Sequence, residues 1–449
     1  MKFTISKSKI DQLVEFISTY IDSNDTFIPF RCIYMHIDTE KLTLVGASST
    51  LAARKIIDLN DNDIQLERTG SFYLSANLLK NIIKKFDKQI TFDAKENLID
   101  IYEGSTLFTL TKLNAGLYPK IDFEDTDNQV QINSQKFDKA IYDVSTSTSS
   151  SNDRLNSLIY KCINITAKNS DELRFLATDS YRLSTEIIKV SKPITIDLTI
   201  DNKNLKKLIT KETPETVNLF FNQDKIGISY DNTVVWTAVN RTQFLDVSAL
   251  FQVKYTRNFK IEKEELLKTI NKALFYQTDK DKKMEFSFEN HKLKINYEVP
   301  EIGTASAESD ALEIVEGNEI EFDFNYNYVK DAVSALDSGM LNIFVSDSED
   351  KLLFISENDP HHIQLITPMR KYYSSQKIMT VAIKGGSIKL SQFLKKIDEI
   401  DTGGQAKEFI KNNSITINGE QPKGRGSKIK VGDIVWINNS IYSITAKEE

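Results

Sequence analysis

The sequence predicts an α+β protein with three similar domains in tandem and a small α+β domain at the C-terminus. Three observations support this prediction. One strand–helix segment occurs three times at nearly constant spacing. A second strand–helix segment occurs once within each copy. The chain from residue 377 onward differs from the rest in charge and has its own order of helices followed by strands.

The first repeated segment reads FTISKSKIDQLVEFIST at 3–19, VQINSQKFDKAIYDVST at 130–146 and FKIEKEELLKTINKALF at 259–275. The copies are 127 and then 129 residues apart. In each, a short strand leads into an amphipathic helix, and Ile10, Phe137 and Leu266 occupy equivalent apolar positions. A period of this length exceeds that of solenoids and propellers, and therefore indicates three like domains.

The second repeated segment reads FYLSANLLKNIIKKFDK at 72–88, LTIDNKNLKKLITKET at 198–213 and FDFNYNYVKDAVSALDSG at 322–339, and each again joins a short strand to a helix. Their apolar residues place one stripe of each helix against a sheet. Short alternating strands follow. Each copy is therefore predicted to contain two βαβββ halves. The expected domains are 1–124, 125–256 and 257–373, called here the first, second and third repeat, and a C-terminal domain at 380–449.

The composition is that of an ordinary soluble protein, with 40% hydrophobic and 27% charged residues. We expect a cytoplasmic protein without a membrane partner, because no run approaches the roughly 20 apolar residues of a membrane helix and the N-terminus lacks a signal peptide. Cys32 and Cys162 lie in apolar, strand-like runs. They are expected to be buried free thiols.

The formal net charge of −7 is unevenly distributed. Residues 377–449 contain 12 basic and 8 acidic residues, against 45 and 56 in the remainder. An acidic body can still hold nucleic acid if its lysines share one surface. Lysines on equivalent helices facing one axis would contact phosphates without reading bases, although any single one is more simply a solvated side chain. The candidates are Lys80, Lys84, Lys85, Lys136, Lys139, Lys203, Lys206, Lys207, Lys268 and Lys272.

Four segments carry a family resemblance: MKFTI at the start, LRFLATDSYRLS at 173–184, FNYNYVKDAVSAL at 324–336 and TPMR at 367–370. In this order they resemble the beta subunit of bacterial DNA polymerase III, the sliding clamp. The resemblance covers residues 1–373 and implies three tandem DNA-clamp domains that form half of a ring. It further implies a homodimer that encircles double-stranded DNA as a processivity factor, with no catalytic site, cofactor or metal of its own.

The same resemblance implies an apolar cleft between the second and third repeats. Through it, the family tethers the DNA polymerase III catalytic subunit, the clamp loader and other proteins with a clamp-binding peptide. Leu245, Ala249 and Tyr181 differ from the residues common at these positions in the family, so the set of peptides that the cleft accepts is expected to differ as well. From the sequence alone, Leu183 and Leu250 are better explained as ordinary core. The cleft residues carried over are Ile159, Thr178, Ser180, Tyr181, Arg182, Leu183, Phe244, Leu245, Ala249, Leu250, Leu365, Pro368, Met369 and Arg370.

After a short linker at 372–377, the pattern predicts helices at 387–400 and 402–413 and strands at 414–420 and 431–445. This order, with ITINGE and KVGDIVWI, resembles the RNA-binding module of ribosomal protein S4, the alpha-L motif. The resemblance implies that the module binds RNA or another nucleic acid. A basic accessory domain that binds protein is the alternative. The candidate contacts are Lys395, Lys396, Lys407, Lys411, Lys423, Arg425 and Lys428.

Catalytic motifs are not apparent in the sequence. It contains neither a P-loop nor a GxSxG nucleophile motif. The adjacent His361 and His362 would point to opposite sides of a strand, and no second cluster stands out to complete a metal site there. The second hypothesis, an RNA-modifying or RNA-binding enzyme whose basic tail recruits substrate, needs a catalytic constellation in 1–373 that the repeat does not offer. We therefore expect a protein that is not an enzyme.

Overall fold

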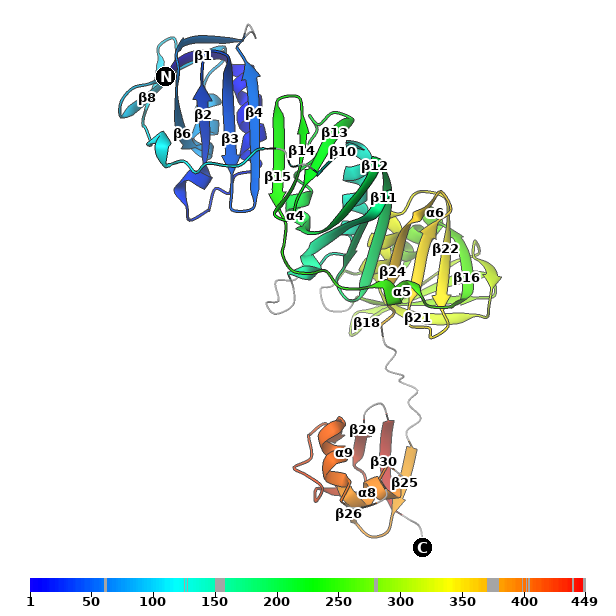
Figure 1. The fold of residues 1–449 in the computed structure, drawn as a ribbon. Coiled ribbons are helices and arrows are strands. Elements are labelled where there is room, and N and C mark those ends of the chain that lie inside the picture. The colour runs from blue at the N-terminus through cyan, green and yellow to red at the C-terminus, as the bar shows by residue number, and fades with distance from the viewer. Residues whose placement is uncertain are drawn as a thin grey trace. The chain divides into compact units, whose positions relative to one another are not determined.

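The computed structural model describes residues 1–59, 63–124, 126, 128–149, 158–277, 282–369, 379–397, 399–400, 402, 404–437 and 440–446. These residues form two compact units, Met1–Pro368 and Met369–Glu449, and each is described by itself (Figure 1). The linker predicted at 372–377 lies outside the described residues. Among the described helices, none has the length and apolar character needed to cross a membrane.

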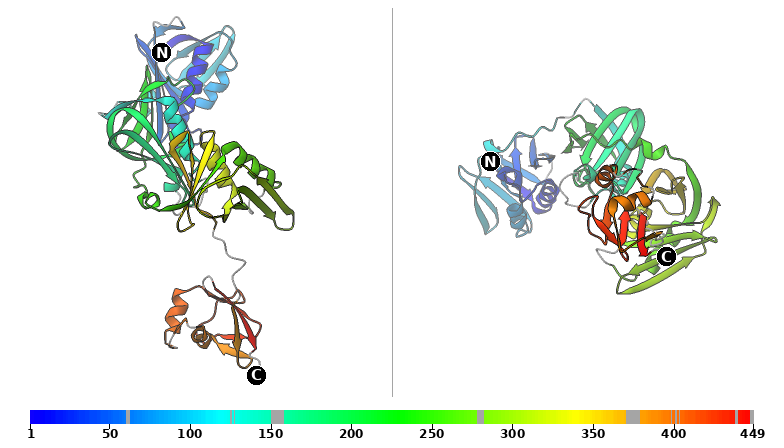
Figure 2. Two further views of the ribbon diagram at one scale, coloured as in Figure 1. Left: turned by 90° about the vertical axis from the view of Figure 1, so that its right-hand side faces the viewer. Right: turned by 90° about the horizontal axis from the view of Figure 1, so that it is seen from below.

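The first repeat consists of two layers of strands with two helices packed against them. Its elements are β1 (Lys2–Ser6), α1 (Lys7–Ser18), η1 (Ile28–Arg31), β2 (Cys32–Ile37), β3 (Lys41–Ala47), β4 (Leu51–Asp58), β5 (Ile64–Arg68), β6 (Gly70–Ser75), α2 (Ala76–Ile83), β7 (Gln89–Ala94), β8 (Leu98–Glu103), β9 (Thr106–Thr111) and η2 (Ala115–Leu117). Each helix starts directly after a strand, where Ser6 or Ser75 accepts a backbone N–H and caps it. The two helices pack side by side (Figure 2).

The second repeat contains an unusually long pair of strands. Its elements are β10 (Asn128–Asn133), α3 (Ser134–Ser145), η3 (Ile159–Lys161), β11 (Cys162–Thr178), β12 (Arg182–Asp201), α4 (Asn202–Leu205), β13 (Thr216–Phe221), β14 (Lys225–Tyr230), β15 (Thr233–Ala238) and α5 (Ser248–Phe251). The strand predicted at 198–201 is the end of β12. The helix expected within 198–213 is present but short, since α4 ends at Leu205. The hydroxyl of Thr213 accepts the backbone N–H of Thr210 at 2.9 Å, a local bond that competes with helix.

The third repeat resembles the first in its order of elements. These are β16 (Tyr255–Glu262), α6 (Lys263–Ala273), β17 (Lys283–Glu289), β18 (Lys292–Val299), β19 (Gly303–Ser309), β20 (Glu313–Glu316), β21 (Ile320–Asn325), α7 (Tyr326–Ala335), β22 (Met340–Ser346), β23 (Leu352–Ser356) and β24 (Asp359–Ile366). Asn325 caps α7 through its side-chain oxygen. Helices α6 and α7 pack against one another, as α1 and α2 do in the first repeat. Both repeats therefore confirm the predicted strand–helix units.

Two sheets continue from one repeat into the next. An eight-stranded sheet has the order β10-β13-β14-β15-β4-β3-β2-β6, and Thr233 of β15 lies opposite Lys55 of β4. A seven-stranded sheet has the order β11-β12-β24-β23-β22-β16-β20, and Leu183 of β12 lies opposite Leu365 of β24. Backbone hydrogen bonds across these junctions satisfy edge groups that would otherwise be exposed. The three repeats are thus joined edge to edge within the first unit.

The second unit is a small α+β domain with its own core. Its elements are β25 (Met379–Ile383), β26 (Ser387–Lys389), α8 (Leu390–Lys396), α9 (Ala406–Asn412), β27 (Ile415–Ile417), β28 (Lys428–Lys430), β29 (Ile434–Ile437) and β30 (Ser440–Ala446). A sheet of order β25-β30-β29-β27 packs on the two helices, and β26 pairs with β28. The predicted helices are confirmed with later starts. Strands β25, β26 and β28 were not predicted, and β26 occupies the start of the segment expected to be the first helix.

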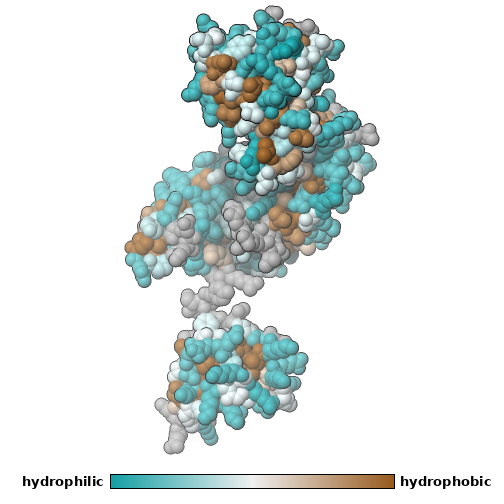
Figure 3. Space-filling model, turned by 90° about the vertical axis from the view of Figure 1, so that its left-hand side faces the viewer, coloured by the Kyte–Doolittle hydropathy of each residue, from teal (hydrophilic) through white to brown (hydrophobic). Residues whose placement is uncertain are grey.

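Two further features concern the thiols and the distribution of apolar side chains. Cys32 and Cys162 are buried and free, as expected. On the face drawn in Figure 3, apolar side chains form small patches among hydrophilic ones. The larger apolar groupings are internal, with one core shared by the first two repeats and a separate one in the third.

Candidate functional site

A distinct apolar cluster lies where the second repeat meets the third. Leu176 of β11, Leu183 of β12, Leu353 of β23 and Leu365 of β24 are buried together on one face of the seven-stranded sheet. We call these four residues the Leu183 cluster. Larger side chains pack against it while keeping part of their surface exposed. They are Phe244, Val247, Leu250, Phe251, Tyr255, Phe344, Ile355 and Ile363.

The loop between β11 and β12 forms a rigid edge beside this cluster. Thr178 donates its hydroxyl to the carbonyl of Arg182 at 2.7 Å, and the Asp179 carboxylate accepts the backbone N–H groups of Tyr181 and Arg182. Ser180 adopts a left-handed conformation with φ of 78°. Thr367, just after β24, donates both its N–H and its hydroxyl to the carbonyl of Tyr181. The loop is therefore held by hydrogen bonds within itself and by hydrogen bonds to the segment that follows β24.

Arg182 holds the two repeats together at this loop. Its guanidinium pairs with Asp179 at 3.0 Å and with Asp331 of α7 at 2.9 Å. It also stacks over the ring of Tyr328 with its central carbon 4.3 Å from the ring centroid. The Tyr181 ring lies 6.4 Å from that of Tyr328 and is 60% exposed. Arg182 is thus occupied within the chain, whereas Tyr181 presents its surface to solvent.

The structure places four of the fourteen cleft residues expected from the sequence in or on the Leu183 cluster. Leu183, Leu365, Phe244 and Leu250 belong to the Leu183 cluster or pack on it, while Leu245 is 43% exposed. Of the remaining members, Thr178 is buried, Pro368 is half-buried, and Ser180 and Ala249 are exposed. Ile159 lies in η3, outside the cluster. Met369 is 44% exposed and belongs to the second unit, and Arg370 lies outside the described residues.

Sequence reasoning missed several members of the cluster. Leu176 and Leu353 belong to the Leu183 cluster, and Val247 and Phe344 pack against it, but the sequence did not single out any of the four. One signal was available: β23 reads LLFIS, with apolar residues on both faces. A strand with apolar residues on both faces is buried on both sides. One face of β23 packs in the core of the third repeat, and the other face packs in the Leu183 cluster.

The predicted lysines on the helices fall into two groups. Lys84, Lys85, Lys136, Lys203, Lys268 and Lys272 are exposed, and Lys268 pairs with Glu265 on its own helix. Lys80, Lys206 and Lys207 are half-buried: Lys80 pairs with Glu15, and Lys206 lies 4.6 Å from the ring centroid of Tyr142. Burial lowers the pKa of Lys206.

Lys139 differs from the other predicted lysines. Its ammonium pairs with Asp143 at 2.7 Å, Asp337 at 3.2 Å and Asp359 at 3.9 Å. Although burial opposes the charge, these carboxylates raise the pKa of Lys139. Lys139 is therefore engaged between the second and third repeats, and its charge is largely compensated within the chain.

The basic residues predicted in the second unit are all at its surface. Lys395 and Lys396 end α8, Lys407 and Lys411 lie on α9, and the segment before and within β28 carries Lys423, Arg425 and Lys428. Each is exposed, and none pairs with a carboxylate among the described residues of this unit. They are available to solvent anions.

The histidine pair is arranged as predicted along β24, with His361 exposed and His362 buried. Sequence reasoning found no groups to accompany them, but the structure supplies two. The carboxylates of Asp143 and Glu186 face His362 from the second repeat, and the three could hold a metal ion.

Comparison with known proteins identifies the family. Models of the N-terminal, central and C-terminal domains of the DNA polymerase III beta subunit match residues 1–122, 131–246 and 248–370 in that order. The chain belongs to the beta sliding clamp family. A model of the S4 domain matches residues 381–445, which adds a nucleic-acid-binding type of module to this clamp.

Relatives and solved structures agree with this membership. The beta sliding clamp of Mycoplasmopsis pulmonis is 26% identical over 375 residues, covering 82% of this chain and all of the relative, and that of Bacillus subtilis is 24% identical over 383 residues, covering 83% of this chain and all of the relative. The crystal structure of the Bacillus subtilis clamp has a TM-score of 0.76 at 22% identity, covering 83% of this chain and all of that one. The crystal structure of the DNA polymerase III beta subunit from Pseudomonas aeruginosa has a TM-score of 0.75 at 18% identity, covering 82% of this chain and all of that one. The S4-like segment extends beyond the clamp relatives.

Proposed function

We propose that this sliding clamp closes as a homodimer around double-stranded DNA and acts as a processivity factor without a catalytic site of its own. The observation that carries the proposal is the tandem array of three clamp repeats joined edge to edge by continuous sheets. Two such chains supply six like domains, enough to close a ring. Head-to-tail contacts in a closed ring use two different surfaces per chain and leave none free for further growth.

The exposed lysines Lys84, Lys85, Lys136, Lys203 and Lys272 are proposed to face the DNA. Lys136, Lys203 and Lys272 lie on α3, α4 and α6, and Lys84 and Lys85 directly follow α2, so exposed lysines occur on or beside repeated helices in all three domains. Point charges on flexible side chains attract phosphates at many positions and read no bases. Such contacts keep DNA centred while allowing movement along it.

The Leu183 cluster is proposed as the floor of a peptide-binding cleft. Its partly exposed neighbours Phe244 and Leu250 offer apolar surface, and the adjoining β11–β12 loop presents the exposed ring of Tyr181. Clefts with buried apolar floors and a few fixed polar groups suit short peptides carrying aliphatic and aromatic anchors. The proposed partners are the DNA polymerase III catalytic subunit, the clamp loader and other proteins with a clamp-binding peptide. Tethering them to the ring raises their effective concentration at the DNA.

The S4-like unit is proposed to bind RNA or another nucleic acid through its exposed Lys395, Lys396, Lys407, Lys423 and Arg425. These cations lie on two helices and on the segment leading into β28. Phosphate contacts of this type provide affinity that falls steeply with salt. The proposed domain boundaries remain 1–124, 125–256, 257–373 and 380–449, and the proposed location is the cytoplasm.

Light scattering during size-exclusion chromatography tests the ring directly. The proposal predicts a particle of twice the 51.2 kDa of one chain. A titration with a fluorescent peptide from the polymerase C-terminus should then give saturable binding, one peptide per chain. A monomer at micromolar concentration, or a dimer that binds no clamp-binding peptide, would contradict the respective part of the proposal.

A further inference from the structure

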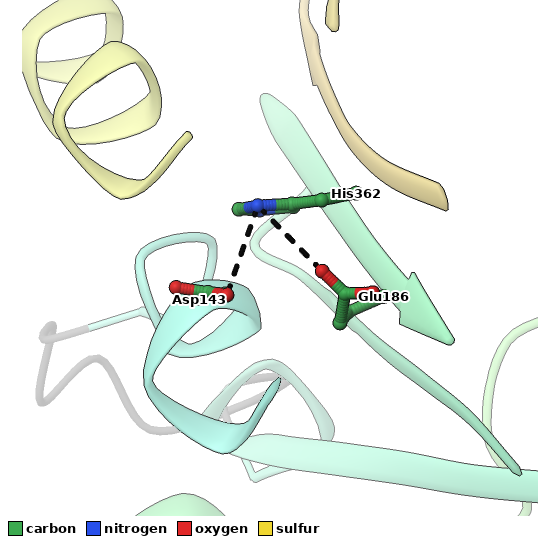
Figure 4. A group of neighbouring side chains, drawn as sticks. All are labelled: Asp143, Glu186 and His362. Carbon is green, nitrogen blue, oxygen red and sulfur yellow. Dashed lines mark ion pairs between the residues drawn. The ribbon is translucent and has the colours of Figure 1, made fainter. Parts of the chain in front are cut away.

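A buried group of ionisable side chains spans the junction between the second and third repeats. Asp143 comes from α3, Glu186 from β12 and His362 from β24 (Figure 4). The His362 Nδ1 atom lies 3.7 Å from Asp143 Oδ2 and 3.7 Å from Glu186 Oε2. All three candidate atoms fall within 4.8 Å of one another. Three elements distant in the sequence thus direct nitrogen and oxygen atoms at one point.

Two of these atoms have no hydrogen-bond partner among the described residues. They are His362 Nδ1 and Glu186 Oε2, on residues that are 0% and 4% exposed. Buried polar atoms are normally satisfied, and an orphaned pair aimed at each other indicates a missing third group. A spacing of 3.7 Å is too long for a hydrogen bond. It is close to the separation of about 3.4 Å between two ligands of one tetrahedral zinc ion.

The surrounding charge also favours a cation. Asp143, Glu186, Asp337 and Asp359 bring four carboxylates to this region, whereas Lys139 is the ammonium that pairs with three of them. If Asp143 turned to a metal, Lys139 would keep Asp337 and Asp359 as partners. His362 is buried, and an imidazole nitrogen can offer a lone pair to a metal ion.

A supporting hydrogen bond holds the histidine ring. The side chain of Gln364 contacts His362 Nε2 at 2.7 Å, and it is held in turn by Ser184 and by the carbonyl of Asp143. Metal-bound histidines almost always donate their second ring N–H to such a partner. A metal at Nδ1 leaves the ring proton on Nε2, so the Gln364 amide nitrogen that faces Nε2 has to turn away and give up its bonds to the Asp143 carbonyl and Ser184.

We propose that Asp143, Glu186 and His362 form a structural site for a divalent cation of the zinc class, which fastens the second repeat to the third. Nitrogen together with carboxylate oxygen suits zinc better than magnesium or calcium, which prefer oxygen alone. A ligand from each side of the junction would tie the sheet edge at β12 and β24 to α3. The site lies beside the seven-stranded sheet that carries the Leu183 cluster, and so stiffens the scaffold of the peptide cleft.

Calorimetric titration of the full chain, stripped with chelator, tests the site. One zinc ion is expected to bind per chain, and its binding is expected to raise the midpoint temperature of thermal unfolding. His362→Gln is expected to weaken that binding about a hundredfold or more, since it removes a ligand. His361→Gln is the matched control, because it alters the exposed neighbour on the same strand and should leave zinc affinity unchanged. Equal affinity of the two variants, or absence of tight zinc binding by the unaltered chain, would overturn the proposal.

Cobalt substitution provides a measurement that needs no variant. Co²⁺ in the unaltered chain should show the visible absorption of four-coordinate nitrogen and oxygen ligation. Glu186→Gln, which preserves shape, should lose it while keeping the elution volume of the unaltered chain. A sulfur-to-cobalt charge-transfer band would place the ion at a cysteine instead, and weak six-coordinate absorption would indicate surface binding only. Either spectrum refutes the site.

Discussion

Replacing Arg182 by alanine tests whether this residue serves the junction more than the cleft. Its side chain is 11% exposed, and the side chain of its partner Asp179 is 7% exposed. Removing one member of a buried ion pair costs about 3–5 kcal/mol, because the other charge stays buried. Asp179 would still accept the backbone N–H groups of Tyr181 and of residue 182, so the lower limit applies. With the loss of stacking on Tyr328, worth about 0.5–1 kcal/mol, we expect a total cost of about 3.5–4 kcal/mol.

Asp331→Asn provides the contrast. The Asp331 side chain is 51% exposed, so its pair with Arg182 is screened by solvent and should contribute less than about 1 kcal/mol. Urea unfolding, followed by tryptophan fluorescence and circular dichroism, measures both free-energy differences. Arg182→Ala should shift the midpoint by at least three times as much as Asp331→Asn. Equal shifts would refute the reasoning and return Arg182 to the role of a solvated cleft residue.

Three further predictions concern binding. Leu250→Ala combined with Met369→Ala should weaken the binding of a polymerase-tail peptide about tenfold or more, because apolar anchors dominate such interfaces. Fluorescence anisotropy measures this affinity, and the dimer should persist. The control Val431→Ala, which truncates an exposed apolar residue of the S4-like unit, should leave the peptide affinity unchanged. Replacing Lys84, Lys85, Lys203 and Lys272 by glutamine should lower the slope of log affinity for duplex DNA against log salt by about 0.9 for each phosphate that the variant no longer neutralises, and an unchanged slope would remove these lysines from the DNA. Deleting 377–449 should abolish retention of RNA in a gel-shift assay while leaving the clamp intact, and RNA binding by the truncated chain would move that activity to the clamp body.

The sequence predicted the repeated elements well because their signals are local. The signal is an apolar stripe directly after a short strand, and the structure starts a helix at such places, capped by Ser6, Ser75 and Asn133. In the second repeat, the Thr213 side chain competes for the backbone N–H of Thr210 after the short helix α4. Such competition depends on the three-dimensional placement of one hydroxyl, which periodicity does not report.

The junctions were harder to predict because they depend on pairing between distant strands. The Leu183 cluster needs β12 beside β24, so Leu176 and Leu353 resemble ordinary core residues until that pairing is known. For the same reason, the sequence shows His362 without companions. Its neighbours Asp143 and Glu186 lie in another repeat, and only the folded sheet brings them within reach.

Retention on DNA of different topology tests the central claim that the chain works as a closed ring. Chains loaded onto a nicked circular plasmid should remain bound through gel filtration at high salt, where direct phosphate contacts are weak. Cutting the same plasmid with a restriction enzyme should release them, because a ring slides off a free end. Equal retention on circular and linear DNA, or equal loss from both, would contradict the account.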